Sequence, residues 1–248
     1  MTALALTKHH GLGNDFLVLL DPLSNQPVSA GLARRLCDRH TGVGADGLIR
    51  CTPGTNGADL TFELRNADGG VAEMSGNGMR CMAQAAIDGG MIDRRDFSVS
   101  TPAGLRAVSV HLETGPGVRQ CSVDMGLAKV EGDIGRATVD MGNPHLVLTV
   151  DDLDAVHETP DPEVNVEFIL VGPEPDAITM RVFERGVGET QACGTGACAA
   201  AAAAHEWGLV GTHVTIHQPG GDGIVDLRPN TIVLTGPTER IARISVDI

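Results

Sequence analysis

The sequence predicts an α+β fold of two similar domains, rich in strands and poor in helices. Three observations predict this class. Two landmarks occur twice in the same order, strand-like segments outnumber helical ones, and the 248 residues include 32 glycines but only 5 Phe, 1 Trp and no Tyr. Such a composition is typical of turn-rich β structure with a core of small side chains. The length allows two domains of about 120 residues each.

The first repeated landmark is a Gly-Asn turn followed by an apolar strand that ends in Asp. It reads GNDFLVLLD at residues 13–21 and GNPHLVLTVD at residues 142–151. The second landmark is a small-residue turn, MSGNGMRC at residues 74–81 and ACGTGAC at residues 192–198. The landmarks keep their order although the segments between them differ in length. We therefore expect two similar domains related by a pseudo-twofold axis.

Ten segments have the composition or the apolar-polar alternation of strands. They are residues 4–8, 16–20, 59–64, 97–100, 105–112, 119–124, 145–150, 177–183, 213–217 and 231–234. Three further segments are predicted to be helical, at residues 30–39, 76–88 and 194–207. The last two stop at Gly89 and Gly208, and glycine is the usual residue just past a final helical turn.

The domain boundary is expected near residues 113–117, which read ETGPG, because Gly and Pro cluster there between two strand patterns. The N-terminal domain then covers residues 1–115 and the C-terminal domain residues 116–237. The tail at residues 238–248 contains the strand-like RISVDI. We expect this tail to pair back with the first domain.

Charge and cysteine content exclude several kinds of partner. A formal net charge of -14 opposes binding to nucleic acid or to an anionic membrane surface. The N-terminus has no signal-peptide pattern, so we expect a cytoplasmic protein whose six cysteines are reduced thiols. No Cys-x-x-Cys pair and no His-Glu-x-x-His motif is present in the sequence, and no metal site is expected.

The repeated Gly-x-Gly turns place Ser75 and Cys193 at the N-termini of two predicted helices, where unpaired backbone N–H groups attract anions. The helix dipole stabilises a thiolate there, so we expect Cys193 to act as a base or nucleophile near neutral pH. An unperturbed thiol, with a pKa of about 8.5, is mostly protonated at that pH. The alternative is that both residues are simple helix caps.

If the pseudo-twofold axis brings these two helix ends together, a substrate carboxylate would bind their N–H donors. Its α-carbon would then lie between Ser75 and Cys193. This geometry suits removal of a proton next to a carboxylate, because preorganised N–H groups stabilise the charge that develops on the oxygens. The chemistry requires neither a metal nor pyridoxal phosphate, so we expect no cofactor.

Several motifs resemble those of the diaminopimelate epimerase family: HGLGNDF, GVGADGLI, RNADGGVAEMSGNGMRC, MGNPHLV, VNVEF and ERGVGETQACGTGACA. The resemblance covers nearly the whole chain. It implies two domains, each a mostly antiparallel sheet or barrel around a central helix, with the active site between them. It also implies a homodimer that interconverts LL- and meso-diaminopimelate for lysine and cell-wall synthesis, with two cysteines acting on opposite faces of the α-carbon.

The resemblance further implies roles for individual residues. Cys193 matches one catalytic acid/base residue, and Ser75 occupies the position of the other. The remaining matches are donors to the reacting carboxylate, groups that hold the rest of the substrate, and groups that tune the catalytic residues. The donors are Gly76, Asn77, Gly194 and Thr195; the holding groups are Asn14, Asn66, Asn143, Asn165, Glu184 and Arg185; the tuning groups are His145 and Glu184.

The sequence departs from the family pattern at two positions. Gly47 replaces a glutamine, and Ser75 replaces a cysteine. A helix dipole contributes about 0.3 to 2 kcal/mol, too little to make an alcohol as good a base as a thiol. Ser75 therefore leaves several hypotheses open: a natural variant that relays a proton, an engineered change, a one-base dehydratase of a hydroxyproline-like amino acid on a related scaffold, or an impaired variant that only binds amino acids.

Overall fold

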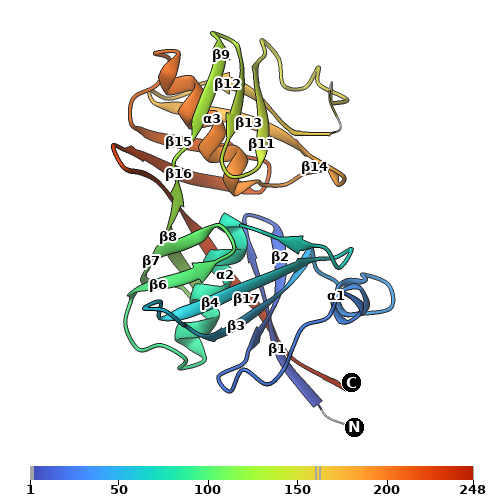
Figure 1. Cartoon of the computed structure of the whole chain (residues 1–248). Coiled ribbons are helices and arrows are strands. Elements are labelled where there is room, and N and C mark those ends of the chain that lie inside the picture. The colour runs from blue at the N-terminus through green and yellow to red at the C-terminus, as the bar shows by residue number, and fades with distance from the viewer. Residues whose placement is uncertain (1–2, 160, 162, 248) are drawn as a thin grey trace. The chain divides into compact units, whose positions relative to one another are not determined.

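The chain, described by a computed structural model over residues 3–159, 161 and 163–247, forms two compact units (Figure 1). Unit 1 comprises residues 1–123 and 237–248, and unit 2 comprises residues 124–236. The chain passes between the units twice, within strand β8 (Val118–Gly126) and within strand β17 (Thr231–Asp247). Strands dominate both units, which confirms the predicted α+β class of two similar domains.

Unit 1 is a closed barrel. Its strands pair in the order β17-β1-β2-β3-β4-β6-β7-β8, and β8 pairs in turn with β17. The short β5 extends the sheet beside β4. The pairs β2–β3 and β4–β6 are parallel, whereas the other pairs with a described register are antiparallel. The strand bounds are β1 (Ala3–Gly11), β2 (Asn14–Leu20), β3 (Gly47–Pro53), β4 (Leu60–Asn66), β5 (Val71–Ala72), β6 (Asp96–Thr101) and β7 (Gly104–Gly115).

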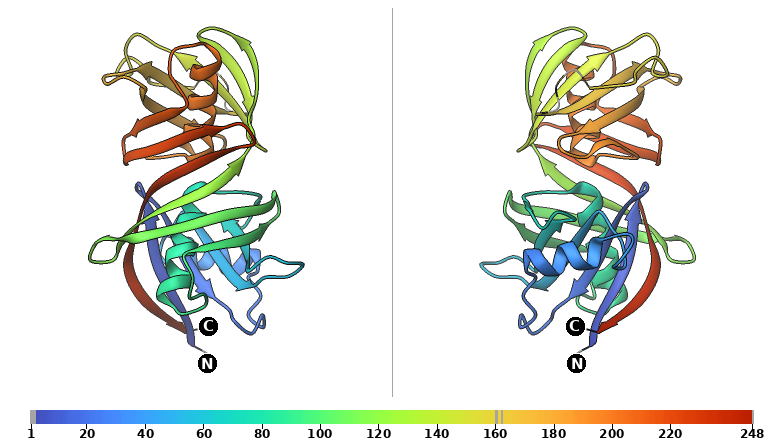
Figure 2. Two further views of the ribbon diagram at one scale, coloured as in Figure 1. Left: turned by 90° about the vertical axis from the view of Figure 1, so that its left-hand side faces the viewer. Right: turned by 90° about the vertical axis from the view of Figure 1, so that its right-hand side faces the viewer.

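Helix α2 (Gly76–Asp88) is the central helix of unit 1. It packs against β1, β2, β3, β4 and β7, and the ribbon views show it among these strands (Figures 1 and 2). Residues 76–86 are all buried, as expected for a helix enclosed by strands. The shorter helix α1 (Ala30–Cys37) packs against β3 and β4, and its buried Leu36 belongs to a second apolar cluster with Leu17 and Leu19 of β2.

Unit 2 repeats this arrangement around helix α3 (Gly194–Glu206). Its strands pair in the order β9-β10-β11-β12-β13-β15-β16-β17, with the short β14 beside β13. Helix α3 packs against β9 to β13, β15 and β16. The strand bounds are β9 (Lys129–Asp133), β10 (Arg136–Asp140), β11 (Pro144–Thr149), β12 (Asn165–Val171), β13 (Ala177–Glu184), β14 (Gly188–Thr190), β15 (His213–Gln218) and β16 (Gly221–Arg228).

The two units share their topology strand by strand. The parallel pairs β11–β12 and β13–β15 of unit 2 occur where β2–β3 and β4–β6 occur in unit 1. The Gly-Asn landmark has a conformational cause, because Gly13 and Gly142 have φ angles of 85° and 93°, a region that favours glycine. Helix α1 lies between β2 and β3, whereas the described residues between β11 and β12 contain no helix.

Some element predictions were wrong or incomplete. The helix expected at residues 30–39 ends at Cys37, because the Asp38 carboxylate accepts hydrogen bonds from the backbone N–H groups of His40 and Thr41 and turns the chain. The strand expected at residues 231–234 continues to Asp247 through Gly236 and Pro237, and its C-terminal half pairs with β1. The segment LIRC at residues 48–51 is strand-like in sequence and lies in β3. Six strands had not been predicted: β5, β9, β10, β12, β14 and β16.

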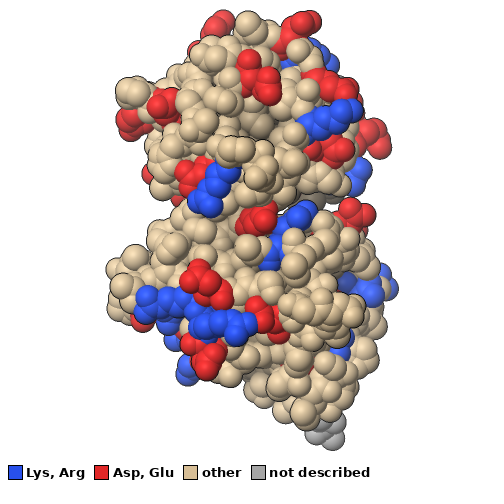
Figure 3. All heavy atoms as spheres, turned by 60° about the vertical axis from the view of Figure 1, so that its left-hand side comes forward, with Lys and Arg blue, Asp and Glu red and all other residues tan. Residues whose placement is uncertain are grey.

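Residues 113–117, where a domain boundary was predicted, comprise the end of β7 and the turn into β8, whereas the compact units divide at Val123/Asp124 and at Gly236/Pro237. Within the described residues, no helix combines the length and the apolar character needed to span a membrane. Acidic and basic side chains are interspersed over the face seen in Figure 3. That face presents no extended surface of one charge.

Candidate active site

Ser75 and Cys193 cap the two central helices with nearly the same geometry. Ser75 has φ and ψ angles of -150° and 115°, and its Oγ accepts the backbone N–H of Gly78 at 3.0 Å. Cys193 has angles of -126° and 119°, and its Sγ accepts the N–H of Gly196 at 3.4 Å. The first turn of each helix begins with N–H groups that have no helical acceptor, which is the anion-binding arrangement expected from the sequence.

In unit 1 the structure brings together Asn14 and Asn77. The Asn77 side-chain amide donates to Asn14 Oδ1 at 3.2 Å, and Arg80 donates to Asn77 Oδ1 at 2.7 Å. Asn14 in turn donates to Asp46 Oδ2 at 2.7 Å, so its amide is held in one orientation. Asn66 lies at the end of β4, paired with Gly47 of β3.

The departure at Gly47 has a packing reason. A Cβ atom at this position would lie 2.8 Å from Leu64 Cδ1 and 2.9 Å from the backbone oxygen of Arg65. Atoms do not approach so closely without a shift of the surrounding backbone. This barrel therefore has no room for the glutamine of the family motif at residue 47.

In unit 2 four polar residues lie on or beside two neighbouring strands. Asn143 lies directly before β11 and His145 is the second residue of that strand, while Asn165 and Glu167 are two positions apart on β12 and share one face. The parallel register sets His145 opposite Asn165. His145 Nδ1 lies 2.7 Å from Glu167 Oε1, and His145 Nε2 lies 3.1 Å from Asn143 Oδ1. Asn165 donates to the backbone oxygen of Pro144 at 3.3 Å.

Glu184 and Arg185 follow one another at the end of β13 but have different surroundings. The backbone N–H of Arg185 donates to Asn165 Oδ1 at 2.9 Å, while the Arg185 residue itself is exposed. Glu184 is half-buried and accepts a hydrogen bond from Thr190 Oγ1 at 2.6 Å. The Glu184 carboxylate acts electrostatically on the Cys193 thiol, and the thiol acts on Glu184 in turn. Of these two residues, Glu184 is therefore the one coupled to the predicted catalytic thiol.

Cys193 is buried, with 5% of its surface exposed. Its backbone N–H donates to Gln218 Oε1 at 2.9 Å, and its Sγ lies 3.5 Å from Thr195 Oγ1. Gly194 begins the helix directly after it. These contacts fix the thiol at the start of α3, next to Glu184.

The electrostatic surroundings correct one expectation from the sequence. Burial raises the pKa of the Cys193 thiol well above its ordinary value, and the Glu184 and Glu167 carboxylates raise it further. The hydrogen bonds with Thr195 and Gly196 favour the thiolate but are outweighed. In the ligand-free protein Cys193 is therefore a protonated thiol near pH 7, not the thiolate expected from the helix terminus alone. Burial also raises the pKa of the Glu184 carboxyl.

Three residues of this site were missed from the sequence: Glu167, Thr190 and Gln218. Glu167 could have been found, because it follows Asn165 by two positions in the motif VNVEF and must share its face on a strand. Gln218 lies 25 residues after Cys193 and contacts it only through the fold of β15. No group of three or more His, Cys, Asp or Glu side chains is arranged for a metal ion among the described residues.

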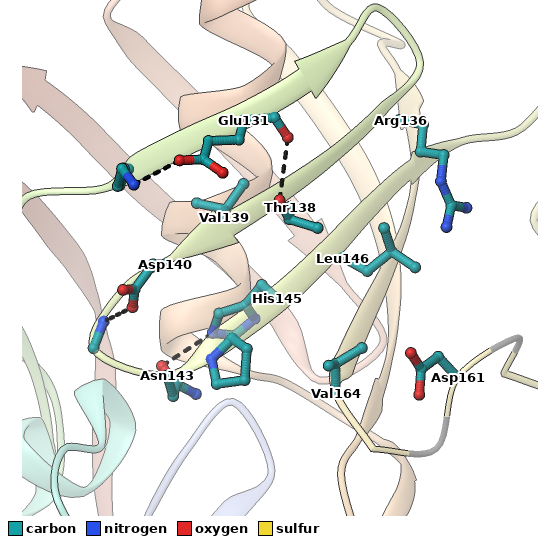
Figure 4. A pocket seen from close by; sticks show the side chains of 13 residues that line it. Glu131, Arg136, Thr138, Val139, Asp140, Asn143, His145, Leu146, Asp161 and Val164 are labelled. Carbon is teal, nitrogen blue, oxygen red and sulfur yellow. Dashed lines mark hydrogen bonds and ion pairs between the residues drawn. The ribbon is translucent and has the colours of Figure 1, made fainter.

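A groove of about 520 Å³ opens beside this set within unit 2 (Figure 4). Asn143 and His145 line it together with charged side chains of both signs. The charged residues are Lys129, Glu131, Arg136, Asp140 and Asp161. A lining of mixed charge suits a small zwitterionic molecule better than a polyanion.

Solved structures establish the same fold at low sequence identity. A phenazine biosynthesis protein of the PhzF family from Bacillus anthracis aligns over all of both chains with a TM-score of 0.79 and 14% identity. A predicted epimerase from Pseudomonas aeruginosa has a TM-score of 0.80 and 16% identity over 99% of both chains. A hydroxyproline epimerase from Agrobacterium vitis has a TM-score of 0.72 and 16% identity, covering 99% of this chain and 91% of that one.

Comparison with sequence relatives identifies the family to which the chain belongs. The family model for diaminopimelate epimerase matches residues 6–131 and 137–241. The diaminopimelate epimerase of Pelotomaculum thermopropionicum is 40% identical, covering 95% of this chain and 96% of the relative. That of Synechocystis is 35% identical, covering 96% and 97%. The chain therefore belongs to the diaminopimelate epimerase family of isomerases.

Proposed function

We propose that this enzyme interconverts LL- and meso-diaminopimelate by removing and returning the proton on the α-carbon. The observation that carries the proposal is Cys193, a buried thiol at the start of α3 on which the Glu184 carboxylate acts electrostatically. Family membership supports the substrate, because the relatives compared above are named diaminopimelate epimerases. The proposed pathway is the formation of lysine and cell-wall precursors.

The proposed base is the thiolate of Cys193. Because the resting thiol is protonated, it must first lose its proton, and the proposed acceptor is the Glu184 carboxylate, which acts electrostatically on the thiol. The thiolate then takes the α-proton and becomes a thiol again. The electron pair of the broken C–H bond moves into the substrate carboxylate. The backbone N–H groups at Gly194 and Thr195 of α3, and at Gly76 and Asn77 of α2, are the proposed donors to that carboxylate.

The proposed role of Ser75 is to supply the proton on the other face of the α-carbon. Its hydroxyl donates a proton to the carbanion, and water returns one to the serine oxygen. An alcohol cannot remove the α-proton at a useful rate, since its pKa exceeds that of a thiol by several units. The enzyme should therefore interconvert the two isomers slowly in both directions, because the forward and reverse reactions share one transition state.

The remaining predicted residues are proposed to hold the distal amino and carboxylate groups of the substrate. A molecule with two ammonium and two carboxylate groups needs both donors and acceptors. The exposed Arg185 is suited to the distal carboxylate, and the half-buried Glu184 to an ammonium group. The amides proposed for the remaining contacts are Asn14, Asn66, Asn143 and Asn165. We also propose a cytoplasmic homodimer on the family resemblance, which sedimentation of the purified protein would test.

A second candidate is one-base dehydration of a hydroxyproline-like amino acid, and the observation that favours it is Ser75. In that reaction Cys193 removes the α-proton and a hydroxide leaves as water. Incubating the enzyme with pure LL- and pure meso-diaminopimelate, followed by chiral chromatography, separates the candidates. Conversion of either isomer into the other supports epimerisation. No conversion, together with formation of a dehydrated product from 3-hydroxyproline, whose hydroxyl is on the carbon next to the α-carbon, would reject it in favour of the dehydratase.

A further inference from the structure

Glu167 is a buried carboxylate to which no role has been assigned above. Its side chain and that of His145 both have no exposed surface, and they meet at 2.7 Å between Oε1 and Nδ1. A buried carboxylate is costly unless it is paired. Within the described part of the chain, the second oxygen, Oε2, has no hydrogen-bond partner. His145 is therefore the side chain that pairs with the Glu167 carboxylate.

The position of Glu167 connects this pair to the helix that carries Cys193. A Cβ atom at Gly196, in the first turn of α3, would lie 2.5 Å from Glu167 Oε1. The carboxylate thus packs directly against the helix start, where the dipole favours negative charge. Glu167 is also one of the groups that act electrostatically on both Cys193 and Glu184.

The hydrogen bond decides which nitrogen of His145 carries a proton. An ionised carboxylate only accepts, so Nδ1 of the imidazole is the donor to Glu167. In this form Nε2 is an acceptor, so the Asn143 amide, whose Oδ1 lies 3.1 Å from Nε2, must turn to present its NH₂ group. An imidazole held in this way has one tautomer and one ring orientation, as in catalytic sites where a carboxylate orients a histidine.

We propose that Glu167 is a positioning residue of the reaction: it holds His145 in its Nδ1–H form beside the helix start that bears Cys193. The proposal rests on the proposed function, in that His145 is taken to adjust the protonation of the catalytic group. Glu167 itself touches no reacting atom. Its effect passes through the imidazole, so its loss should lower turnover while leaving substrate binding nearly unchanged.

The test compares Glu167→Leu, which removes the acceptor at similar volume, with Glu167→Gln, which keeps an oxygen for Nδ1–H. Nitrogen-15 NMR of the His145 ring, assigned with His145→Asn, reads the tautomer directly. We expect Nδ1–H in the parent enzyme and in Glu167→Gln, and its loss in Glu167→Leu. We expect kcat to fall about 10- to 100-fold in Glu167→Leu with KM within about twofold, and Glu167→Gln to retain most of kcat.

A matched control is Asp21→Asn, which alters another fully buried carboxylate, bound by Arg50 in unit 1. It should lower stability but leave kcat within about twofold of the parent enzyme. An unchanged His145 tautomer in Glu167→Leu would overturn the proposal, as would equal losses of kcat in the Leu and Gln variants. The NMR result needs no substrate. If the parent enzyme fails to convert diaminopimelate, the proposed function falls while the tautomer result still decides the role of Glu167.

Discussion

The central helices α2 and α3 begin alike but have different surroundings. Both have 13 residues and a cap side chain that accepts the N–H three residues later. Inside unit 1, α2 carries the fully buried polar residues Arg80 and Gln84. Gln84 accepts hydrogen bonds from His9 and Thr238 and donates to the backbone oxygen of Gly117 at 2.6 Å. Hydrogen bonds therefore tie α2 to its barrel.

Helix α3 is instead enclosed by close packing. Its residues from Ala197 to Ala204 are buried and, apart from Cys198, are all alanine. The polar groups of unit 2 gather at the start of α3, around Cys193 and Glu184. The comparison teaches that a repeated turn reproduces the cap geometry, whereas the side chains packed around each helix start decide what chemistry the cap can perform.

The largest expected effect is the loss of Cys193. Cys193→Ala removes the only proposed thiol base, so we expect interconversion of the diaminopimelate isomers to fall by about 10³-fold or more. Cys198→Ala changes a second buried thiol of the same helix and should stay within about threefold of the parent rate. Chiral chromatography of timed reactions measures both variants. A Cys193→Ala enzyme that keeps its activity would show that the difference between the caps Ser75 and Cys193 has no part in catalysis.

The next effect tests the other cap. Ser75→Cys supplies the acid/base group that the family pattern contains, so we expect epimerisation to increase by about 10²-fold under reducing conditions. Ser75→Ala should lower the rate by less than about tenfold, because the serine is a weak proton donor. An unchanged rate in Ser75→Cys would mean that serine is not the deficient member of the pair.

The polar surroundings of α2 predict acid sensitivity in unit 1. Burial lowers the pKa of His9 from 6.5 to about 4. Between these values the unfolded chain binds a proton that the folded chain does not, so the free energy of unfolding falls as the pH decreases. We expect the parent protein to lose about 2 kcal/mol more than His9→Gln between pH 6.5 and 4.5. Urea unfolding followed by circular dichroism measures the difference, and parallel losses in the two proteins would contradict it.

The smallest effect concerns the start of α3. The raised pKa of Cys193 predicts slow alkylation by iodoacetamide at pH 7 that accelerates as the pH rises and the thiolate forms. Glu184→Gln removes a neighbouring negative charge, so we expect alkylation of Cys193 at pH 8 to be about tenfold faster. Mass spectrometry of the labelled chain assigns the modified cysteine. Slower alkylation in Glu184→Gln would mean that Glu184 favours the thiolate.

Local signals in the sequence predicted much of the fold and the positions of the two helix caps in the candidate site. The bounds expected for α2 match the structure, because a capping residue and a terminal glycine are both short-range signals. Strand β12 was missed because it lies in the middle of its sheet with both faces largely buried, so it lacks alternation. The polar strands β9 and β10 have few apolar residues and gave no strand signal.

The chemistry of Cys193 depended on contacts that no local pattern contains. Its pKa is raised by Glu167 and Glu184, which reach it only once β12 and β13 are packed against α3. The pairing of His145 with Glu167 joins residues 22 positions apart through the parallel register of β11 and β12. The helix start could be predicted from the sequence, but the state of its thiol could not.

The most direct test of the account measures deuterium incorporation at the α-carbon. Each pure isomer of diaminopimelate is incubated with the enzyme in D₂O, and proton NMR monitors the loss of its α-proton signal. Cys193 is proposed to be the only efficient base, and it approaches one face of the carbon. The account therefore predicts that one isomer exchanges its α-proton at least about 10²-fold faster than the other. Equal exchange of the two isomers, or exchange of neither, would contradict it.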